Sequence, residues 1–182
     1  MCGSYCTFDK VMPVAEQLSR VYDLVPILSE NASSTDSRFG EAKHFRSLLE
    51  EYTGRPVITS IREAEPIGPK SLLDALVLAP CTGNTVAKLS CGITDSAVTM
   101  AAKAQLRNQK PVIIAVSTND GLAANAENIG RLLCRKYVYF VPFFQDSPLK
   151  KPASLTADFS KIEETVEAAL RGEQLQPLLC VK

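Results

Sequence analysis

The sequence predicts a doubly wound, Rossmann-like α/β fold in which a parallel sheet carries helices on both faces. Two observations support this prediction. Short apolar runs rich in β-branched residues alternate with longer amphipathic stretches, and the middle runs are apolar throughout. Continuous apolar runs are typical of strands covered on both sides, and the alternation is typical of right-handed crossovers between parallel strands.

Five apolar runs are expected to form strands: 23–29, 56–60, 73–79, 110–117 and 137–143. Helices are expected where apolar residues recur at three- and four-residue steps. These stripes are Phe8, Val11, Ala15, Leu18 and Tyr22, then Phe45, Leu48 and Leu49, then Ala97, Met100, Ala101 and Ala104, and then Ile129, Leu132 and Leu133. A last helix is expected over roughly 158–171, ending at Gly172, because glycine favours the position after a helix.

Composition favours one globular domain over residues 1–182. The chain is 46% hydrophobic, and twenty basic residues balance twenty acidic ones without a long run of like charge. Nucleic-acid binding is not expected, and no apolar run is long enough for a membrane span. We therefore expect a cytoplasmic protein whose partner is a small molecule or a protein. No metal site is expected, because the six cysteines form no C-x-x-C pair and His44 is the single histidine.

Small, hydroxylic or amide residues occupy three loops, 2–6 (CGSYC), 80–85 (PCTGNT) and 117–120 (STND), and Ser29 closes another strand. Helix starts offer unpaired backbone N–H groups to an anion, so these loops suit a phosphate. Each loop alone is equally an ordinary helix cap, but the fold brings strand ends to one edge. Neither a dinucleotide fingerprint nor a Walker-type phosphate loop is present, which favours a mononucleotide cofactor.

Residues 79–104 (APCTGNTVAKLSCGITDSAVTMAAKA) resemble the P-A-S-A-N-T-x-x-K-x-A-x-G-x-x-D segment of the flavoproteins that include the homo-oligomeric cysteine decarboxylases and the flavin prenyltransferases. The matching residues are Pro80, Asn84, Thr85, Lys88, Gly92 and Asp95. Residues 116–119 (VSTN) stand where the decarboxylases carry P-x-M-N. Residues 3–6 (GSYC) resemble their first phosphate loop, which follows a strand in that family, so the sequence is expected to lack its first strand.

Within this superfamily the chain resembles the B subunits of dipicolinate synthases along nearly its whole length. The segments that carry the likeness are 34–42, 64–70, 94–104, 116–122, 141–152 and the tail LQPLL. The resemblance implies a flavodoxin-like three-layer fold, a flavin mononucleotide cofactor and an A subunit with a dinucleotide-binding domain. It further implies oxidation of a dihydrodipicolinate-level intermediate to dipicolinate, a dicarboxylate, in the mother cell of a spore-forming bacterium. Homo-oligomers built from trimers are implied as well.

The resemblance also implies a set of cofactor-binding residues. Gly3, Ser4 and Ser29 would approach the phosphate, Thr82, Gly83, Asn84 and Thr85 would lie against the flavin mononucleotide, and Ser117 and Asn119 would line the flavin side of the pocket. Lys88 is expected to be a surface lysine rather than a ligand.

Departures from the family bear on the reaction. The decarboxylases carry a histidine where Pro66 stands here, so cysteine decarboxylation is poorly supported. Catalytic residues stay unassigned, because capping explains Asp95 and Asp120 at helix starts. Proton abstraction is left open between the partner, Asp120 and water. A non-catalytic scaffold subunit, or another flavin-dependent decarboxylase or prenyltransferase, remains an alternative function.

Two stretches have two interpretations each. Residues 31–42 (NASSTDSRFGEA) form either a series of helix caps or a substrate loop in which Arg38 pairs with a carboxylate. Residues 145–152 (QDSPLKKP) form either a flexible crossover or a basic contact for substrate or partner through Lys150 and Lys151.

Overall fold

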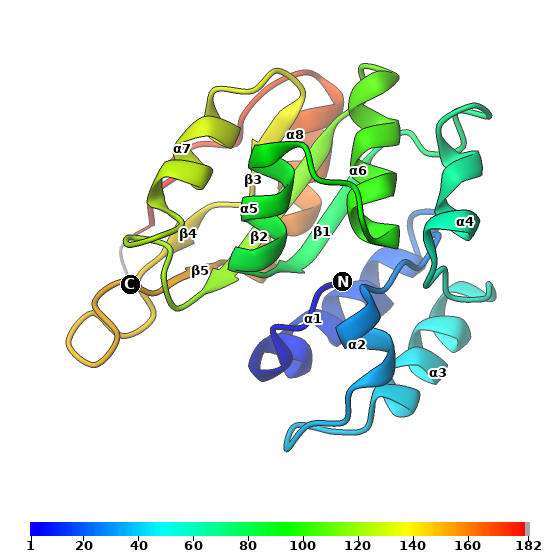
Figure 1. Cartoon of the computed structure of the whole chain (residues 1–182), viewed down its shortest axis with the longest axis horizontal. Helices are drawn as coiled ribbons and strands as arrows, with labels where there is room; N and C mark the ends of the chain where they lie inside the picture. Colours follow the sequence, from blue (N-terminus) through cyan, green and yellow to red (C-terminus); the bar gives the residue numbers. More distant parts are fainter. Residues whose placement is uncertain (181–182) are drawn as a thin grey trace.

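The structure is a computed structural model that describes residues 1–180. In chain order its elements are η1 (Tyr5–Thr7), α1 (Phe8–Ser19), α2 (Glu30–Ser34), α3 (Ala42–Thr53), α4 (Ile61–Ala64), η2 (Glu65–Ile67), β1 (Leu76–Cys81), α5 (Gly83–Cys91), α6 (Ala97–Arg107), β2 (Val112–Thr118), α7 (Ala126–Leu133), β3 (Val138–Phe140), β4 (Phe143–Phe144), β5 (Leu155–Ala157), η3 (Phe159–Lys161) and α8 (Ile162–Leu170). Figure 1 shows how these elements surround the central strands. Within residues 1–180, no helix combines the length and apolar character needed to cross a bilayer.

The central sheet confirms the predicted doubly wound fold and adds an antiparallel part to it. Strand β2 lies between β1 and β3 and is parallel to both. Its carboxyl end also pairs antiparallel with β5, which pairs antiparallel with β4. The run 137–143 is therefore two short strands rather than one, and Pro142, which has no N–H to donate to a ladder, lies between them.

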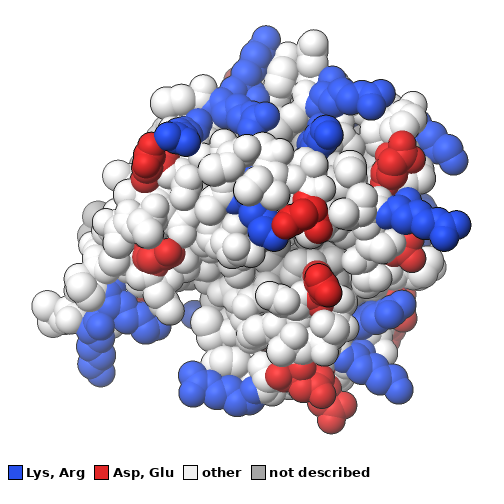
Figure 2. All heavy atoms as spheres, in the orientation of Figure 1, with Lys and Arg blue, Asp and Glu red and all other residues white. Residues whose placement is uncertain are grey.

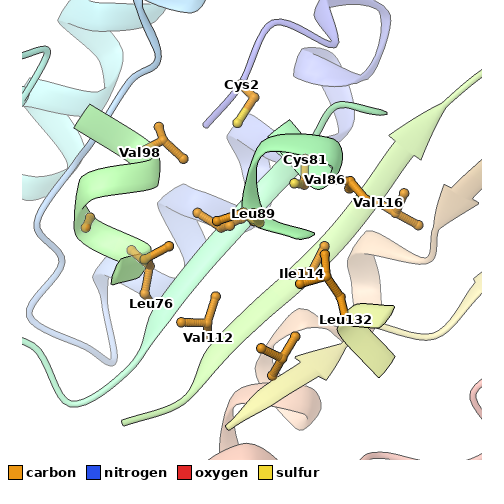
Figure 3. Packing of buried hydrophobic residues seen from close by; sticks show 14 of the residues in the cluster. Cys2, Leu76, Cys81, Val86, Leu89, Val98, Val112, Ile114, Val116 and Leu132 are labelled. Atoms are coloured by element: carbon orange, nitrogen blue, oxygen red, sulfur yellow. The ribbon is translucent and has the colours of Figure 1, made fainter. Parts of the chain in front are cut away.

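Each central strand buries side chains on both faces, which explains its continuous apolar sequence. Leu76, Leu78, Val112 and Ile114 pack under α5, α6 and α7, on the near side of the sheet in Figure 1. Figure 3 shows this cluster, with Leu89 and Leu132 reaching the strands from the helices. Residues at alternate positions face the opposite way and pack against α1 and α8; they include Ala79, Ile113 and Ala115.

The first part of the chain forms less sheet than the sequence predicts. The expected strands 23–29 and 56–60 meet only in one parallel bridge, between Ile27 and Ile58. Prolines lie at 26 and 56, where each removes a ladder donor. Met1 and Cys2 form backbone hydrogen bonds with two different segments. The Ser29 N–H donates to the Met1 carbonyl oxygen at 3.0 Å, and the Cys2 N–H donates to the Pro80 carbonyl oxygen at 3.0 Å. The residues before η1 thus join the Ile27 segment to β1.

Candidate functional site

A cavity of about 540 Å³ lies at the carboxyl ends of β1 and β2, beside the loop that leads into η1. This volume is within the range of sites for small molecules and cofactors. Six of the nine cofactor-binding residues expected from the sequence line it: Gly3, Ser4, Thr82, Gly83, Ser117 and Asn119. Three loops that are distant in the sequence therefore meet at one site.

The first loop and the end of β2 touch directly in this cavity. Ser4 Oγ and Ser117 Oγ lie 2.8 Å apart, within hydrogen-bond distance. The Ser4 carbonyl accepts a hydrogen bond from the Thr7 hydroxyl at 2.8 Å, which orders the turn before α1. Two hydroxyl groups are thus held side by side at the cavity wall.

The loop after β1 enters α5 through residues that are small for a structural reason. Thr82 Oγ1 accepts the Thr85 N–H at 3.3 Å and so caps the helix. At Gly83, a Cβ would lie 2.5 Å from Thr118 Oγ1, 2.6 Å from Asn125 Nδ2 and 2.8 Å from an Asp120 carboxylate oxygen. No side chain larger than hydrogen fits there without moving that network, so the start of α5 packs closely on the loop after β2.

Asp120 organises the loop after β2 rather than reaching into the cavity. Its carboxylate accepts a hydrogen bond from Thr118 Oγ1 and one from Asn125 Nδ2 at 2.8 Å. Asn125 in turn accepts a hydrogen bond from Asn128 Nδ2 at 3.0 Å. Asp120 is not among the cavity-lining residues. Its carboxylate positions Thr118 and Asn125 and has two donors already, which disfavours a role as general base.

Four residues singled out in the sequence lie outside the cavity lining. Ser29 caps α2 by accepting the Ala32 N–H at 3.3 Å. Asn84 is exposed, and Thr85 is buried with its hydroxyl 3.1 Å from that of Thr82. Arg38 is exposed and lies over the ring of the neighbouring Phe39, 4.8 Å from its centroid.

The stretch 31–42 contains one clear capping interaction. Asp36 Oδ1 accepts the N–H of Ala42, the first residue of α3, at 2.9 Å. Ser33 and Ser34 donate their hydroxyls to the Glu30 carbonyl at 2.9 and 2.8 Å. These hydrogen bonds support the helix-cap interpretation of this stretch.

Nine further residues line the cavity, and the sequence had singled out the segments of only some of them. They are Cys6, Thr7 and Lys10 around the start of α1, Thr118 at the end of β2, and Phe144, Asp146, Lys151, Ser154 and Thr156 from β4, β5 and the loop joining them. Cys6 and Thr118 belong to the predicted loops 2–6 and 117–120, and Asp146 and Lys151 belong to the stretch 145–152, whereas no sequence pattern pointed to the other five. Of the pair Lys150 and Lys151, Lys151 lines the cavity and Lys150 does not. The antiparallel pairing of β2 with β5 places this loop at the site.

Asp146 is the one carboxylate in the cavity lining. Its Oδ1 accepts the Ser154 hydroxyl at 2.5 Å, and its Oδ2 lies 3.6 Å from Lys151 Nζ. Burial raises the pKa of Asp146, but the Ser154 hydrogen bond and the Lys151 charge outweigh it, so the pKa is below its ordinary value. Asp146 is therefore ionised at neutral pH and is a weak base.

Two family-motif residues have a structural role. Lys88 Nζ lies 2.8 and 2.9 Å from the two carboxylate oxygens of Asp95, so the pair joins α5 to the segment before α6. Neither residue lines the cavity. Pro66 lies in η2, also away from the cavity lining.

Comparisons with known proteins identify the family of this chain. Residues 1–168 match the sequence model of the family described as Flavoprotein. The chain is 45% identical over 180 residues to the B subunit of dipicolinate synthase from Bacillus subtilis (strain 168), and the match covers 98% of this chain and 90% of the relative.

Solved structures show the same fold. The crystal structure of the dipicolinate synthase B subunit from Bacillus halodurans C is 45% identical, with a TM-score of 0.90, and the match covers 99% of this chain and 93% of that one. The FMN-dependent cysteine decarboxylase SpaF is 21% identical, with a TM-score of 0.67 over 92% of this chain and 93% of that one. At this lower identity the likeness is one of fold.

Proposed function

The chain belongs to the Flavoprotein family, and from this premise we propose that it is the flavin-mononucleotide-binding subunit of a dipicolinate synthase. The observation that carries the proposal is the meeting of three sequence-distant loops, around Ser4, Thr82 and Ser117, at one hydroxyl-rich cavity. The 45% identity to a dipicolinate synthase B subunit over nearly the whole chain supports the more specific assignment.

The residues present fit a phosphate-bearing flavin. Helix α5 begins at Gly83 in the cavity lining, and the first N–H groups of a helix have no partner within it. Ser4, Thr82 and Ser117 line the same cavity, and their hydroxyls can donate to phosphate oxygens. The helix start and these hydroxyls suit an anion, and the nearby Asp120 carboxylate accepts hydrogen bonds from Thr118 and Asn125 instead of lining the cavity.

The proposed reaction is the oxidation of a dihydropyridine dicarboxylate to the aromatic pyridine dicarboxylate, which removes two electrons and two protons from the ring. When bound, the flavin would supply the two-electron acceptor. The chain's own residues would hold the cofactor and the substrate. A partner A subunit with a dinucleotide-binding domain, a homo-oligomer built from trimers and a place in the mother-cell cytoplasm during sporulation belong to the same proposal.

A scaffold subunit without catalysis is the second candidate. One observation favours it: among the described residues, the one carboxylate that lines the cavity, Asp146, has a lowered pKa, and Asp120 outside the lining is engaged by two donors. In that case the partner subunit would perform the whole reaction.

An absorbance spectrum of the purified full-length protein tests the proposal first. We expect flavin bands between about 300 and 550 nm that survive desalting after flavin mononucleotide is added. Mixing with the A subunit and the dihydro substrate without oxygen should bleach those bands. Retained flavin that substrate and A subunit leave oxidised would support the scaffold candidate, and no flavin binding under any condition would refute the proposed cofactor.

A further inference from the structure

Two lysines contribute positive charge to the cavity lining. Lys10 comes from α1, and Lys151 comes from the loop between β4 and β5. Lys10 is exposed and has neither a hydrogen bond nor an ion pair with any residue in 1–180. Lys151 Nζ is 3.6 Å from an Asp146 oxygen, beyond the usual length of a charged hydrogen bond. Both ammonium groups are therefore available to a ligand.

Lys10 also borders a second, smaller space. This cavity of about 250 Å³ shares Lys10, Phe144 and Thr156 with the larger one. Phe159 and Val14 add apolar wall to it, and Ser160 adds a hydroxyl. The shared residues make the two spaces neighbours, and the aromatic side chains suit a planar ring.

The cavity lining offers two different environments for an anion: the small-residue loops for a phosphate and the lysines for carboxylates. Small residues and the start of α5 let a phosphate approach the loops around Ser4, Thr82 and Ser117 closely, whereas the lysine stems extend from α1 and the β4–β5 loop. The charged side chains among the described lining residues are Lys10, Lys151 and Asp146, so the lining carries one positive charge in excess. Figure 2 shows that basic and acidic side chains are interspersed on the face drawn there, without a broad patch of one sign. The positive excess is thus a local property of the cavity.

We propose that Lys10 and Lys151 bind the two carboxylates of a small planar dicarboxylate and so determine substrate specificity. This inference rests on the proposed function, because the substrate class follows from it. Each ammonium group would form a charge-assisted hydrogen bond with one carboxylate. The ring would lie beside Phe144, and Ser4, Thr82 and Ser117 would be left to the cofactor phosphate.

The test uses the full chain loaded with flavin mononucleotide and three variants, Lys10→Met, Lys151→Met and Lys150→Met. Lys150 is the matched control, because it is exposed, adjacent in the chain and outside both cavity linings. Pyridine-2,6-dicarboxylate is titrated while the flavin absorbance is followed, and binding is measured independently by calorimetry. Affinities for flavin mononucleotide and riboflavin are measured for every variant.

We expect Lys10→Met and Lys151→Met each to weaken dicarboxylate binding roughly tenfold or more, the loss typical of a hydrogen bond to a charged group. Both should keep wild-type affinity for flavin mononucleotide and riboflavin, and Lys150→Met should change nothing. Pyridine-2-carboxylate, with one carboxylate, should respond to only one of the two substitutions.

Three results would overturn the inference: no dicarboxylate binding by the wild type, equal binding by all variants, or a loss of affinity for flavin mononucleotide but not for riboflavin. The last would assign the lysines to the cofactor phosphate. If the wild type takes no flavin, the proposed function fails, and calorimetry with the dicarboxylate still decides the role of the lysines. Because both lysines are exposed, their substitution should leave the unfolding midpoint unchanged, which serves as the folding control.

Discussion

Ser4 and Ser117 place their hydroxyl oxygens 2.8 Å apart, although 113 positions separate them in the sequence. One belongs to the loop before η1 and the other to the carboxyl end of β2. Ser117 is buried and Ser4 is half-buried, so the pair is held at the cavity wall by its surroundings. Hydroxyl groups in this arrangement can donate to two oxygens of one phosphate.

The first prediction concerns this pair. Ser4→Ala and Ser117→Ala should each weaken flavin mononucleotide binding roughly ten- to a hundredfold, because each removes a hydrogen bond to a charged group. Riboflavin, which has no phosphate, should bind both variants as it binds the wild type. Fluorescence titration measures both affinities. Ser19→Ala, at the far end of α1, is the control, and an equal loss for both ligands would contradict a phosphate role.

The second prediction contrasts two glycines. Gly83→Ala should lower the free energy of unfolding by about 1–3 kcal/mol, because its Cβ overlaps the network of Thr118, Asp120 and Asn125. It should also weaken flavin binding. Gly130→Ala has no heavy atom within 4 Å of its Cβ and lies inside α7, so it should raise stability by about 1 kcal/mol.

Urea unfolding of both glycine variants, with flavin titration of Gly83→Ala, provides the measurement. If Gly83→Ala is as stable as the wild type and binds flavin normally, the close packing of α5 on the loop after β2 is unimportant for the site.

The third prediction concerns a buried amide in α6. Gln105 is fully buried, and its Oε1 has no hydrogen-bond partner within residues 1–180. Its Nε2 donates to Leu73 O at a long 3.4 Å, whereas Lys110 Nζ donates to the same oxygen at 2.7 Å. Gln105→Met should therefore raise the free energy of unfolding by about 1 kcal/mol, since it replaces an amide that carries an unsatisfied oxygen with an apolar side chain of similar shape.

Thermal and urea unfolding measure the Gln105 effect, with the exposed Gln17→Met as control. A loss of stability in Gln105→Met would show that the amide oxygen is satisfied in solution.

The fourth prediction is a pH dependence at the pair of Lys88 and Asp95. The Lys88 hydrogen bond holds the pKa of Asp95 below its ordinary value. A carboxyl group with a lowered folded-state pKa stabilises the protein above its unfolded pKa, and that contribution is lost as pH falls through the folded pKa. Wild type should therefore unfold at a higher temperature than Asp95→Asn at pH 7, and the difference should shrink as pH falls below the ordinary aspartate pKa of about 3.9.

Melting temperatures at low and high salt complete this test, because salt screens exposed charges. Lys88→Met should reproduce the effect of Asp95→Asn at pH 7, and neither should change flavin affinity. A difference between wild type and Asp95→Asn that persists in acid would mean that packing, not charge, is involved.

The sequence alone predicted the doubly wound architecture and three of the loops that line the cavity. Continuous apolar runs such as 110–117 predict a sheet covered on both faces, since only doubly buried strands tolerate them. The small-residue loops around Ser4, Thr82 and Ser117 predict a cofactor edge, because parallel strands bring their ends together. Both inferences depend on local pattern and on general rules of chain topology.

Only the tertiary structure decided which residues of β4, β5 and the loop joining them line the cavity. Because Ser117 pairs with Thr156, residues of the polar stretch 145–152, including Lys151, lie at the cavity. The sequence pattern does not separate Lys151, which lines the cavity, from its neighbour Lys150, which does not; the long-range pairing of β5 with β2 brings their loop to the site. Asn84 lies outside the lining while its neighbour Gly83 lies in it, because successive residues of α5 point in different directions around the helix. Local propensity selects the elements, whereas contacts between distant segments select which of their residues meet.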